Sequence, residues 1–291
     1  LQDDGVMTLA LDAPFTHILK VPPPTMPELS AMEWFAMRLC KDAGLDTEEF
    51  AVTSLEGYEG PVFIAERFDI DDRTRFDNDP QGYPRYLLAE DFCSALNVES
   101  SQKYSGTFAE VADLLLQHSS SPNECGRGLL RQFMLCWLVG NSDFHLKNLS
   151  LLKEADPNLQ HYTSVRLSPA YDITSCAVYV NQVPAVDGLT VMNSRVPYLQ
   201  VLFQAAEHYL NIPREETAAM ARECIDRVRE ASAYWSQPQN MPKAIQEHAS
   251  SVAMISRASS SLIQQRCNGY EMELNALQQR QRRTPRMQGF R

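Results

Sequence analysis

One short polar segment near the middle of the chain gathers side chains that could do chemistry. An aspartate, a histidine, a lysine and an asparagine fall close together within residues 141–150, NSDFHLKNLS. The segment directly follows residues 128–139, which are apolar almost all round and should form a buried helix. Polar groups at the edge of an apolar core need hydrogen-bond partners or a ligand. Taken alone, the segment fits a ligand site and a simple hydrogen-bonded turn equally well.

The spacing of Asp143 and Asn148 favours the ligand site. It is the spacing found in the catalytic loop of protein kinases, where the aspartate receives the proton of the acceptor hydroxyl and the asparagine holds a metal ion. Both side chains must then face one cleft from one short, rigid loop. We therefore interpret residues 141–150 as a catalytic loop for phosphoryl transfer.

A second, carboxylate metal ligand is expected soon afterwards along the chain. Asp172 is suitably placed in the segment 167–175, after a run of residues that favours a β-strand. On its own, an aspartate before Ile-Thr-Ser is equally well explained as a helix N-cap. Paired with the preceding loop, it is better explained as a metal ligand.

Lys20 ends the β-favouring run 16–20 and matches the strand lysine that contacts nucleotide phosphates in kinases. A lysine at a strand end is otherwise usually a solvated charge. Glu33 and Glu28 are both possible partners for it, and the sequence does not choose between them. An adenine ring is expected between two lobes, at a hinge formed by residues 66–68 that would contact it mainly through the main chain.

The surrounding elements divide into a β-rich first part and a helical second part. The predicted strands are 6–11, 16–20, 50–55, 61–68, 149–152 and 164–167. The predicted helices are 28–43, 85–96, 108–117, 128–139, 198–210, 214–235 and a long stretch from 242 to about 280. We predict an α+β protein with a small β-rich N-lobe, residues 1–84, and a larger, mainly helical C-lobe, residues 85–291. The acidic loop 69–84 is the best boundary.

Composition narrows the function classes further. The net charge of −11 over 291 residues argues against a broad nucleic-acid-binding surface. The arginine-rich tail 280–291 is a local exception, either a solvated terminus or a tail that binds a partner. No run approaches the roughly 20 apolar residues of a membrane span, and no secretory signal is evident. We therefore expect a cytoplasmic protein that does not associate with membranes.

The seven cysteines have neither zinc-ligand spacing nor the pattern of a disulfide framework. Most of them lie inside apolar helical patterns. We expect them to be small buried hydrophobic residues.

Four motifs follow one another in a characteristic order: HILK, AERFD, GNSDFHLKNLSLL and LSPAYDITS. Together they resemble the HipA-type serine/threonine kinases of bacterial toxin–antitoxin modules, over residues 16 to about 175. The resemblance implies a two-lobed protein-kinase-like fold. It also implies an ATP- and Mg²⁺-dependent protein kinase that phosphorylates an aminoacyl-tRNA synthetase, stops translation and has an antitoxin protein as partner.

The same resemblance assigns roles to single residues. It implies Asp143 as catalytic base, with Asn148 and Asp172 as magnesium ligands. The implied nucleotide contacts are Lys20, Glu66, Arg67, Phe68, His145, Leu146, Lys147, Asn148, Tyr171 and Asp172.

One family element is not found. HipA-type kinases carry a Gly-rich loop with an autophosphorylated serine ahead of the HILK strand, and nothing before Val6 resembles it. The sequence begins with Leu1, so we expect this loop to lie upstream of it. The length suggests the compact kind of family member, in which the extra N-terminal domain is a separate small protein.

Two other functions remain open. The missing loop favours a catalytically silent pseudokinase or partner-binding module, whereas the complete set of Asp143, Asn148 and Asp172 favours catalysis. A small-molecule or lipid kinase also fits the loop. The order of the surrounding motifs is more consistent with a protein kinase.

Overall fold

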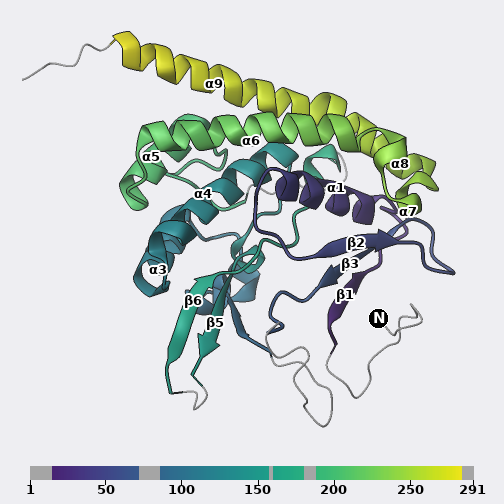
Figure 1. Ribbon diagram of the computed structural model, residues 1–291, viewed down its shortest axis with the longest axis horizontal. Helices are drawn as coiled ribbons and strands as arrows, with labels where there is room; N and C mark the ends of the chain where they lie inside the picture. Colours follow the sequence, from purple (N-terminus) through teal and green to yellow (C-terminus); the bar gives the residue numbers. More distant parts are fainter. Residues whose placement is uncertain (1–14, 72–85, 157–159, 180–187, 284–291) are drawn as a thin grey trace, which may run out of the picture.

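The computed structural model describes residues 15–71, 86–156, 160–179 and 188–283 (Figure 1). Its strands are β1 His17–Lys20, β2 Phe50–Thr53, β3 Val62–Glu66, β4 Leu88–Asp91, β5 Ser150–Ala155 and β6 Tyr162–Leu167. Its longer helices are α1 Leu29–Asp42, α3 Phe108–His118, α4 Pro122–Val139, α5 Leu199–Tyr209, α6 Arg214–Trp235, α8 Ala249–Arg257 and α9 Gln264–Arg283. Short helical turns are α2 Phe92–Ala95 and α7 Lys243–Gln246, and a π-helical stretch, Ala258–Ile263, joins α8 to α9.

The N-lobe is a three-stranded antiparallel sheet covered by α1. The strand order is β1-β3-β2, with Lys20 opposite Phe63 and Phe50 opposite Ala65. Helix α1 follows the predicted apolar spacing, and Gly44, at φ +82°, lies just beyond its end. Because α1 also packs on α4, α6 and α8, it joins the sheet to the helical part of the molecule.

The second part contains a sheet of its own, in the order β4-β5-β6. The predicted helix 85–96 is wrong, because residues 88–91 form strand β4 and only the short α2 follows. The reason is pairing across the chain: Leu88 lies opposite Lys153 and Asp91 opposite Ser150. Asp91 then caps α2, its side chain accepting a hydrogen bond from the main-chain N–H of Ser94 at 2.9 Å.

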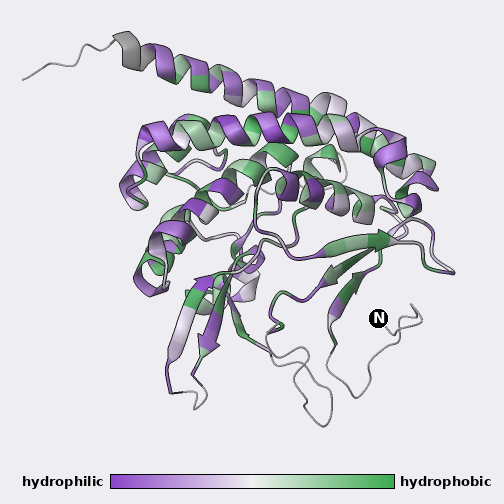
Figure 2. Cartoon of the chain, in the orientation of Figure 1, coloured by the Kyte–Doolittle hydropathy of each residue, from purple (hydrophilic) through white to green (hydrophobic). Residues whose placement is uncertain are grey.

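A helical layer covers α1 and α4. In Figure 1, α6 and α9 run side by side above them, and α6 contacts both α1 and α9. The Trp235 ring, at the end of α6, packs edge-on with the Trp34 ring of α1, and the ring centroids are 5.4 Å apart. The indole N–H of Trp235 also donates a hydrogen bond to the Asp42 carboxylate at 2.6 Å. In Figure 2, hydrophobic and hydrophilic residues alternate along α6 and α9, as expected of helices that bury one face.

The predicted two-part α+β organisation is confirmed, with a few differences in detail. Helix α4 begins at Pro122 rather than at residue 128, because proline is well tolerated in the first turn even though two glycines follow. The predicted long C-terminal helix is divided into α7, α8, the π-helical stretch and α9. Strand 6–11 and the tail beyond residue 283 lie outside the described residues. Much of the predicted boundary loop does too, so the division at residue 84 stays a prediction.

Six of the seven cysteines are buried and Cys176 is partly buried, as their apolar surroundings predict. Within the described residues, no helix combines the length and apolar character that crossing a membrane requires.

Candidate active site

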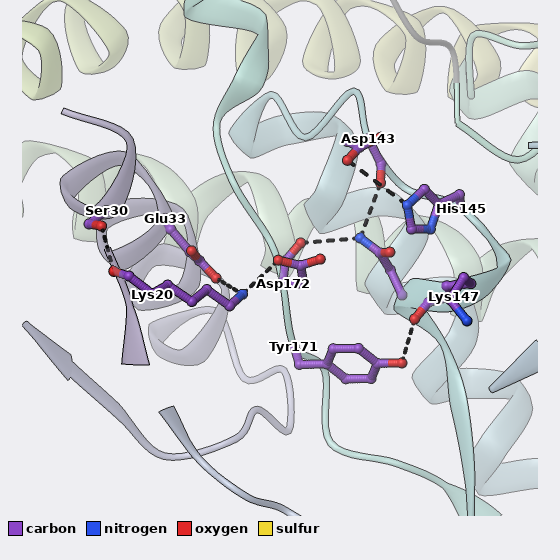
Figure 3. A network of polar contacts seen from close by, with 9 residues as sticks. Lys20, Ser30, Glu33, Asp143, His145, Lys147, Tyr171 and Asp172 are labelled. Atoms are coloured by element: carbon purple, nitrogen blue, oxygen red, sulfur yellow. Dashed lines mark hydrogen bonds and ion pairs between the residues drawn. The ribbon is translucent and has the colours of Figure 1, made fainter. Parts of the chain in front are cut away.

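Three segments that are distant in sequence meet at Lys20 (Figure 3). The Lys20 Nζ lies 2.5 Å from Oε1 of Glu33 on α1 and 2.7 Å from Oδ1 of Asp172. The Ser30 hydroxyl donates to the main-chain carbonyl of Lys20 at 3.2 Å, which ties the end of β1 to the first turn of α1. The structure therefore selects Glu33, not Glu28, as the partner of Lys20.

The electrostatics of this cluster keep Lys20 charged. Burial alone would lower the pKa of Lys20, but the carboxylates of Glu33 and Asp172 outweigh it and hold that pKa above its usual range. Burial raises the pKa of Glu33 to about 7, against the opposing effect of the Lys20 charge. A fixed cation thus lies between two acidic groups, an arrangement suited to phosphate oxygens.

Asp172 has an unusual backbone conformation. Its φ of +57° lies in the left-handed region, which aspartate tolerates better than most residues. The preceding segment is anchored to the N-lobe side, because the main-chain N–H of Glu48 donates to the carbonyl of Ala170 at 3.0 Å. The turn at Asp172 directs its half-exposed carboxylate towards Lys20.

The loop 141–149 begins where α4 ends, at Gly140 with φ +83°. Asn141 Oδ1 accepts a hydrogen bond from the main-chain N–H of Asp143 at 3.1 Å. The Asn148 amide donates to two main-chain carbonyls, that of Asp143 at 3.1 Å and that of Asp172 at 3.3 Å. Asn148 therefore fastens the loop to the Asp172 turn.

The predicted metal ligands fit Mg²⁺ in their chemistry. Among the described residues, Oδ1 of Asn148 accepts no hydrogen bond, although this side chain is buried. The Asp172 carboxylate is close by, and both offer the hard oxygen atoms that Mg²⁺ prefers. No group of three or more His, Cys, Asp or Glu in the described part of the chain could hold a metal ion by itself. Two protein ligands are typical of a site that shares its Mg²⁺ with substrate phosphates.

Asp143 lies across Asn148 from the Asp172 turn. Its Oδ1 accepts a hydrogen bond from the hydroxyl of Tyr104 at 2.5 Å, and its Oδ2 lies 3.9 Å from Nε2 of His145. Burial lowers the pKa of His145, against the opposing charge of Asp143, and so favours the neutral imidazole. Sequence reasoning missed Tyr104, because no spacing rule links it to Asp143, 39 residues further along.

The other predicted nucleotide contacts lie in different settings. Phe68 stacks on Tyr171 with ring centroids 5.1 Å apart. The Arg67 guanidinium is paired with Asp69 at 2.6 Å. Glu66 lies at the end of β3, opposite His17 of β1.

Two residues of the loop 141–149 turn their side chains elsewhere. Lys147 forms an ion pair with Asp91 at 2.7 Å, while its main-chain carbonyl accepts a hydrogen bond from the Tyr171 hydroxyl at 2.7 Å. The Leu146 side chain is completely buried. A nucleotide contact by Leu146 would therefore be made by its main chain.

Comparison with known families places the chain among its relatives. The family model for the HipA-like C-terminal domain matches residues 4–235. The chain belongs to this family. Helices α8 and α9 of this HipA-like chain lie beyond the matched region.

Two curated relatives are named as kinases. "Putative kinase Y4mE" of Sinorhizobium fredii is 32% identical over 186 residues, covering 62% of this chain and 41% of the relative. "Putative kinase" of Haemophilus influenzae is 30% identical over 172 residues, covering 56% and 46%. The HipA-like chain spans about half the length of the curated relatives it matches.

Two solved structures share the fold. HipA of Shewanella oneidensis MR-1, solved with HipB and operator DNA, superposes with a TM-score of 0.69 at 21% identity, covering 91% of this chain and 60% of HipA. The proinflammatory kinase CtkA of Helicobacter pylori superposes with a TM-score of 0.54 at 13% identity, covering 90% and 88%. The fold of the HipA-like chain, a small β-rich lobe beside a larger helical one, is thus kinase-like.

Proposed function

We propose that this HipA-like chain is an ATP- and Mg²⁺-dependent serine/threonine protein kinase, the toxin component of a bacterial toxin–antitoxin module. The observation that carries the proposal is the link made by Asn148, whose amide bonds the main chain of both Asp143 and Asp172. With Lys20 held against Asp172, the linked segments bring together a cation for phosphates, oxygen ligands for a metal and a carboxylate base.

Each group has a defined task in the proposed reaction. Lys20 binds phosphate oxygens of ATP and orients them, and Asn148 and Asp172 would hold Mg²⁺. When bound, Mg²⁺ neutralises the negative charge that develops on the transferred phosphoryl group. Asp143 accepts the proton of the serine or threonine hydroxyl while that oxygen bonds to the γ-phosphorus. The bond between the γ-phosphorus and the β–γ bridging oxygen breaks, and ADP leaves.

We further propose a protein substrate and a protein partner. The substrate expected from the family is an aminoacyl-tRNA synthetase, whose phosphorylation would inhibit translation. The partner is an antitoxin, since the related HipA was solved with HipB and operator DNA. Because this chain carries a net charge of −11, we expect contact with DNA to be made chiefly through the partner.

Calorimetry tests the nucleotide site first. Wild-type protein should bind ATP in the presence of Mg²⁺, and Asp172→Ala should lose this binding, because it removes a metal ligand and a partner of Lys20. Asp113→Ala is the matched control, since Asp113 is an exposed carboxylate on α3. Equal binding by wild type and Asp172→Ala would contradict the assigned site.

Phosphoryl transfer tests the chemistry. Purified synthetases are incubated with the kinase and labelled ATP, and phosphoserine and phosphothreonine are identified by mass spectrometry. Asp143→Asn should reduce transfer by about 10²- to 10⁴-fold while ATP binding persists. Full activity of this variant would contradict the role of Asp143 as catalytic base. If labelled phosphate were found on a small metabolite but on no protein, the substrate would be a small molecule instead.

A further inference from the structure

The carboxylate of Asp143 is held by a tyrosine that no catalytic motif includes. The Tyr104 hydroxyl donates to Oδ1 of Asp143 at 2.5 Å, and the Tyr104 and His145 rings pack in a T-shaped arrangement with centroids 5.0 Å apart. The other carboxylate oxygen, Oδ2, accepts no hydrogen bond from the described residues. One oxygen of the base is therefore engaged, and the second is available to an acceptor hydroxyl.

The segment that carries Tyr104 is fixed directly to the catalytic loop. The main-chain carbonyl of Lys103 accepts a hydrogen bond from the N–H of Leu146 at 3.1 Å. Gly106 packs so closely on Leu146 that a Cβ added there would lie 2.5 Å from its Cδ2. One main-chain hydrogen bond and one close contact with the Leu146 side chain, on either side of Tyr104, thus hold its ring near the loop, and a side chain at position 106 would force Leu146 to shift.

The hydrogen bond from Tyr104 restricts the rotation of the half-exposed Asp143 side chain. Asp143 has 43% of its side chain exposed and forms its one side-chain hydrogen bond within the described residues with Tyr104. Without this bond the carboxylate could turn about its side-chain torsions, and the base would lose its alignment with the acceptor. Nε2 of the buried His145 cannot replace this hydrogen bond, because it lies 3.9 Å from Oδ2 of Asp143.

We propose that Tyr104 is a positioning residue for phosphoryl transfer, which fixes Asp143 through Oδ1 so that Oδ2 receives the proton of the acceptor. This inference rests on the proposed kinase function. It adds a residue from the segment between α2 and α3 to a site otherwise built from the N-lobe, the loop 141–149 and the Asp172 turn.

Tyr104→Phe tests the proposal with little disturbance, because it keeps the ring beside His145 and removes only the hydroxyl. We expect kcat for transfer to a protein acceptor to fall about tenfold or more, as for the loss of a hydrogen bond to a charged group. The KM for ATP, the calorimetric affinity for Mg²⁺-ATP and the melting temperature should stay at wild-type values. Tyr162→Phe, which changes an exposed tyrosine on β6, is the matched control.

A second variant separates positioning from packing. Replacing Tyr104 by 3-fluorotyrosine retains a hydroxyl donor, so kcat should stay within about threefold of wild type if the hydrogen bond matters. A wild-type kcat for Tyr104→Phe would overturn the positioning role, as would an equal loss in both variants. Phosphate found on Tyr104 after reaction would overturn it too, because the tyrosine would then be an acceptor.

Asp143→Asn, measured in parallel, distinguishes this inference from the function on which it rests. If Asp143→Asn is inactive and Tyr104→Phe is fully active, the kinase proposal stands and the role of Tyr104 fails. If Asp143→Asn is fully active, the base assignment fails and the role of Tyr104 fails with it.

Discussion

The two sides of the candidate active site are built on different principles. On the side expected to bind phosphates, Lys20, Glu33 and Asp172 come from three separate segments and are joined by ion pairs at 2.5 and 2.7 Å. On the side expected to bind the acceptor, Asp143 is held by a phenol and lies near a buried imidazole. The first side depends on pairing between opposite charges, and the second on the direction of one hydrogen bond from a neutral phenol.

The difference fits the species that each side would meet. ATP and Mg²⁺ bring large charges of both signs, so a cluster of compensating charges can exchange partners as they bind. An acceptor hydroxyl is neutral and offers one proton. The base that faces it therefore needs the correct orientation more than it needs neighbouring charges that balance its own. Changes on the phosphate side should therefore affect binding, whereas changes on the acceptor side should affect the rate of transfer.

The largest expected effect follows from removing the cation of the phosphate side. Lys20→Met leaves two acidic groups without their partner, one of them the buried Glu33. We expect the affinity for Mg²⁺-ATP to fall by about 10²-fold or more, since a charged phosphate contact is lost and acidic repulsion is left. Calorimetry on this variant provides the measurement.

Lys41→Met is the matched control for that prediction. Lys41 forms an ion pair of similar length, 2.6 Å, with Glu49, whose side chain is 70% exposed. A surface pair of this kind contributes little. Equal losses in the two variants would show that the charge of the N-lobe, and not the Lys20 cluster, controls binding, and the contrast between the two sides would fail.

Part of this arrangement could be predicted from the sequence. Asp143 and Asn148 share one short loop, so a fixed spacing within one segment identified them. Helix α1 was predicted from periodicity alone, because its apolar face packs as an independent amphipathic helix would.

Contacts between segments that are distant along the chain could not be predicted from the sequence. The choice of Glu33 over Glu28 and the approach of Tyr104 to Asp143 depend on how segments pack, which local spacing does not encode. The strand β4 was missed for the same reason, because its partner β5 lies about 60 residues away along the chain. Local patterns therefore predicted which loop residues could do chemistry, and the tertiary fold shows which groups hold them.

Glu48, a buried carboxyl behind the phosphate side, predicts a pH dependence of stability. Its carboxyl forms no hydrogen bond with the described residues, and burial raises its pKa to about 8, with Lys20 opposing and Glu33 adding to the shift. Because the pKa in the folded state lies above the ordinary value near 4.5, the folded protein favours the protonated form. The contribution of Glu48 to the free energy of unfolding is fully present below about pH 4.5 and is lost as the pH rises through about 8.

Glu48→Gln should remove that dependence, because the amide is neutral at every pH. Near pH 5 the variant and the wild type should have similar free energies of unfolding. At pH 9 the variant should be more stable by roughly 3 kcal/mol. Urea unfolding at a series of pH values measures this difference in free energy of unfolding. Glu49→Gln, at the exposed neighbouring residue, is the control. A difference between Glu48→Gln and the wild type that stays constant from pH 5 to pH 9 would show that Glu48 does not titrate in this range.

The smallest expected effect concerns Lys147, which lies in the catalytic loop but belongs to neither side by its side chain. The family resemblance implies a nucleotide contact for this residue, whereas its ammonium group pairs with Asp91 at 2.7 Å and its side chain is 39% exposed. If the ion pair is its main role, Lys147→Ala should lower stability by about 0.5 to 1 kcal/mol and leave the affinity for Mg²⁺-ATP within about twofold of wild type.

Asp91→Asn is the matched partner of Lys147→Ala and makes the outcome decisive, because asparagine can still cap α2 but carries no charge. Both variants break the same ion pair, but only Lys147→Ala removes a positive charge from the catalytic loop. Similar small changes in both would assign Lys147 to the attachment of the loop to β4. A loss of nucleotide affinity confined to Lys147→Ala would mean that the lysine leaves Asp91 when ATP binds, and the phosphate side would then extend along the loop to within four residues of the base.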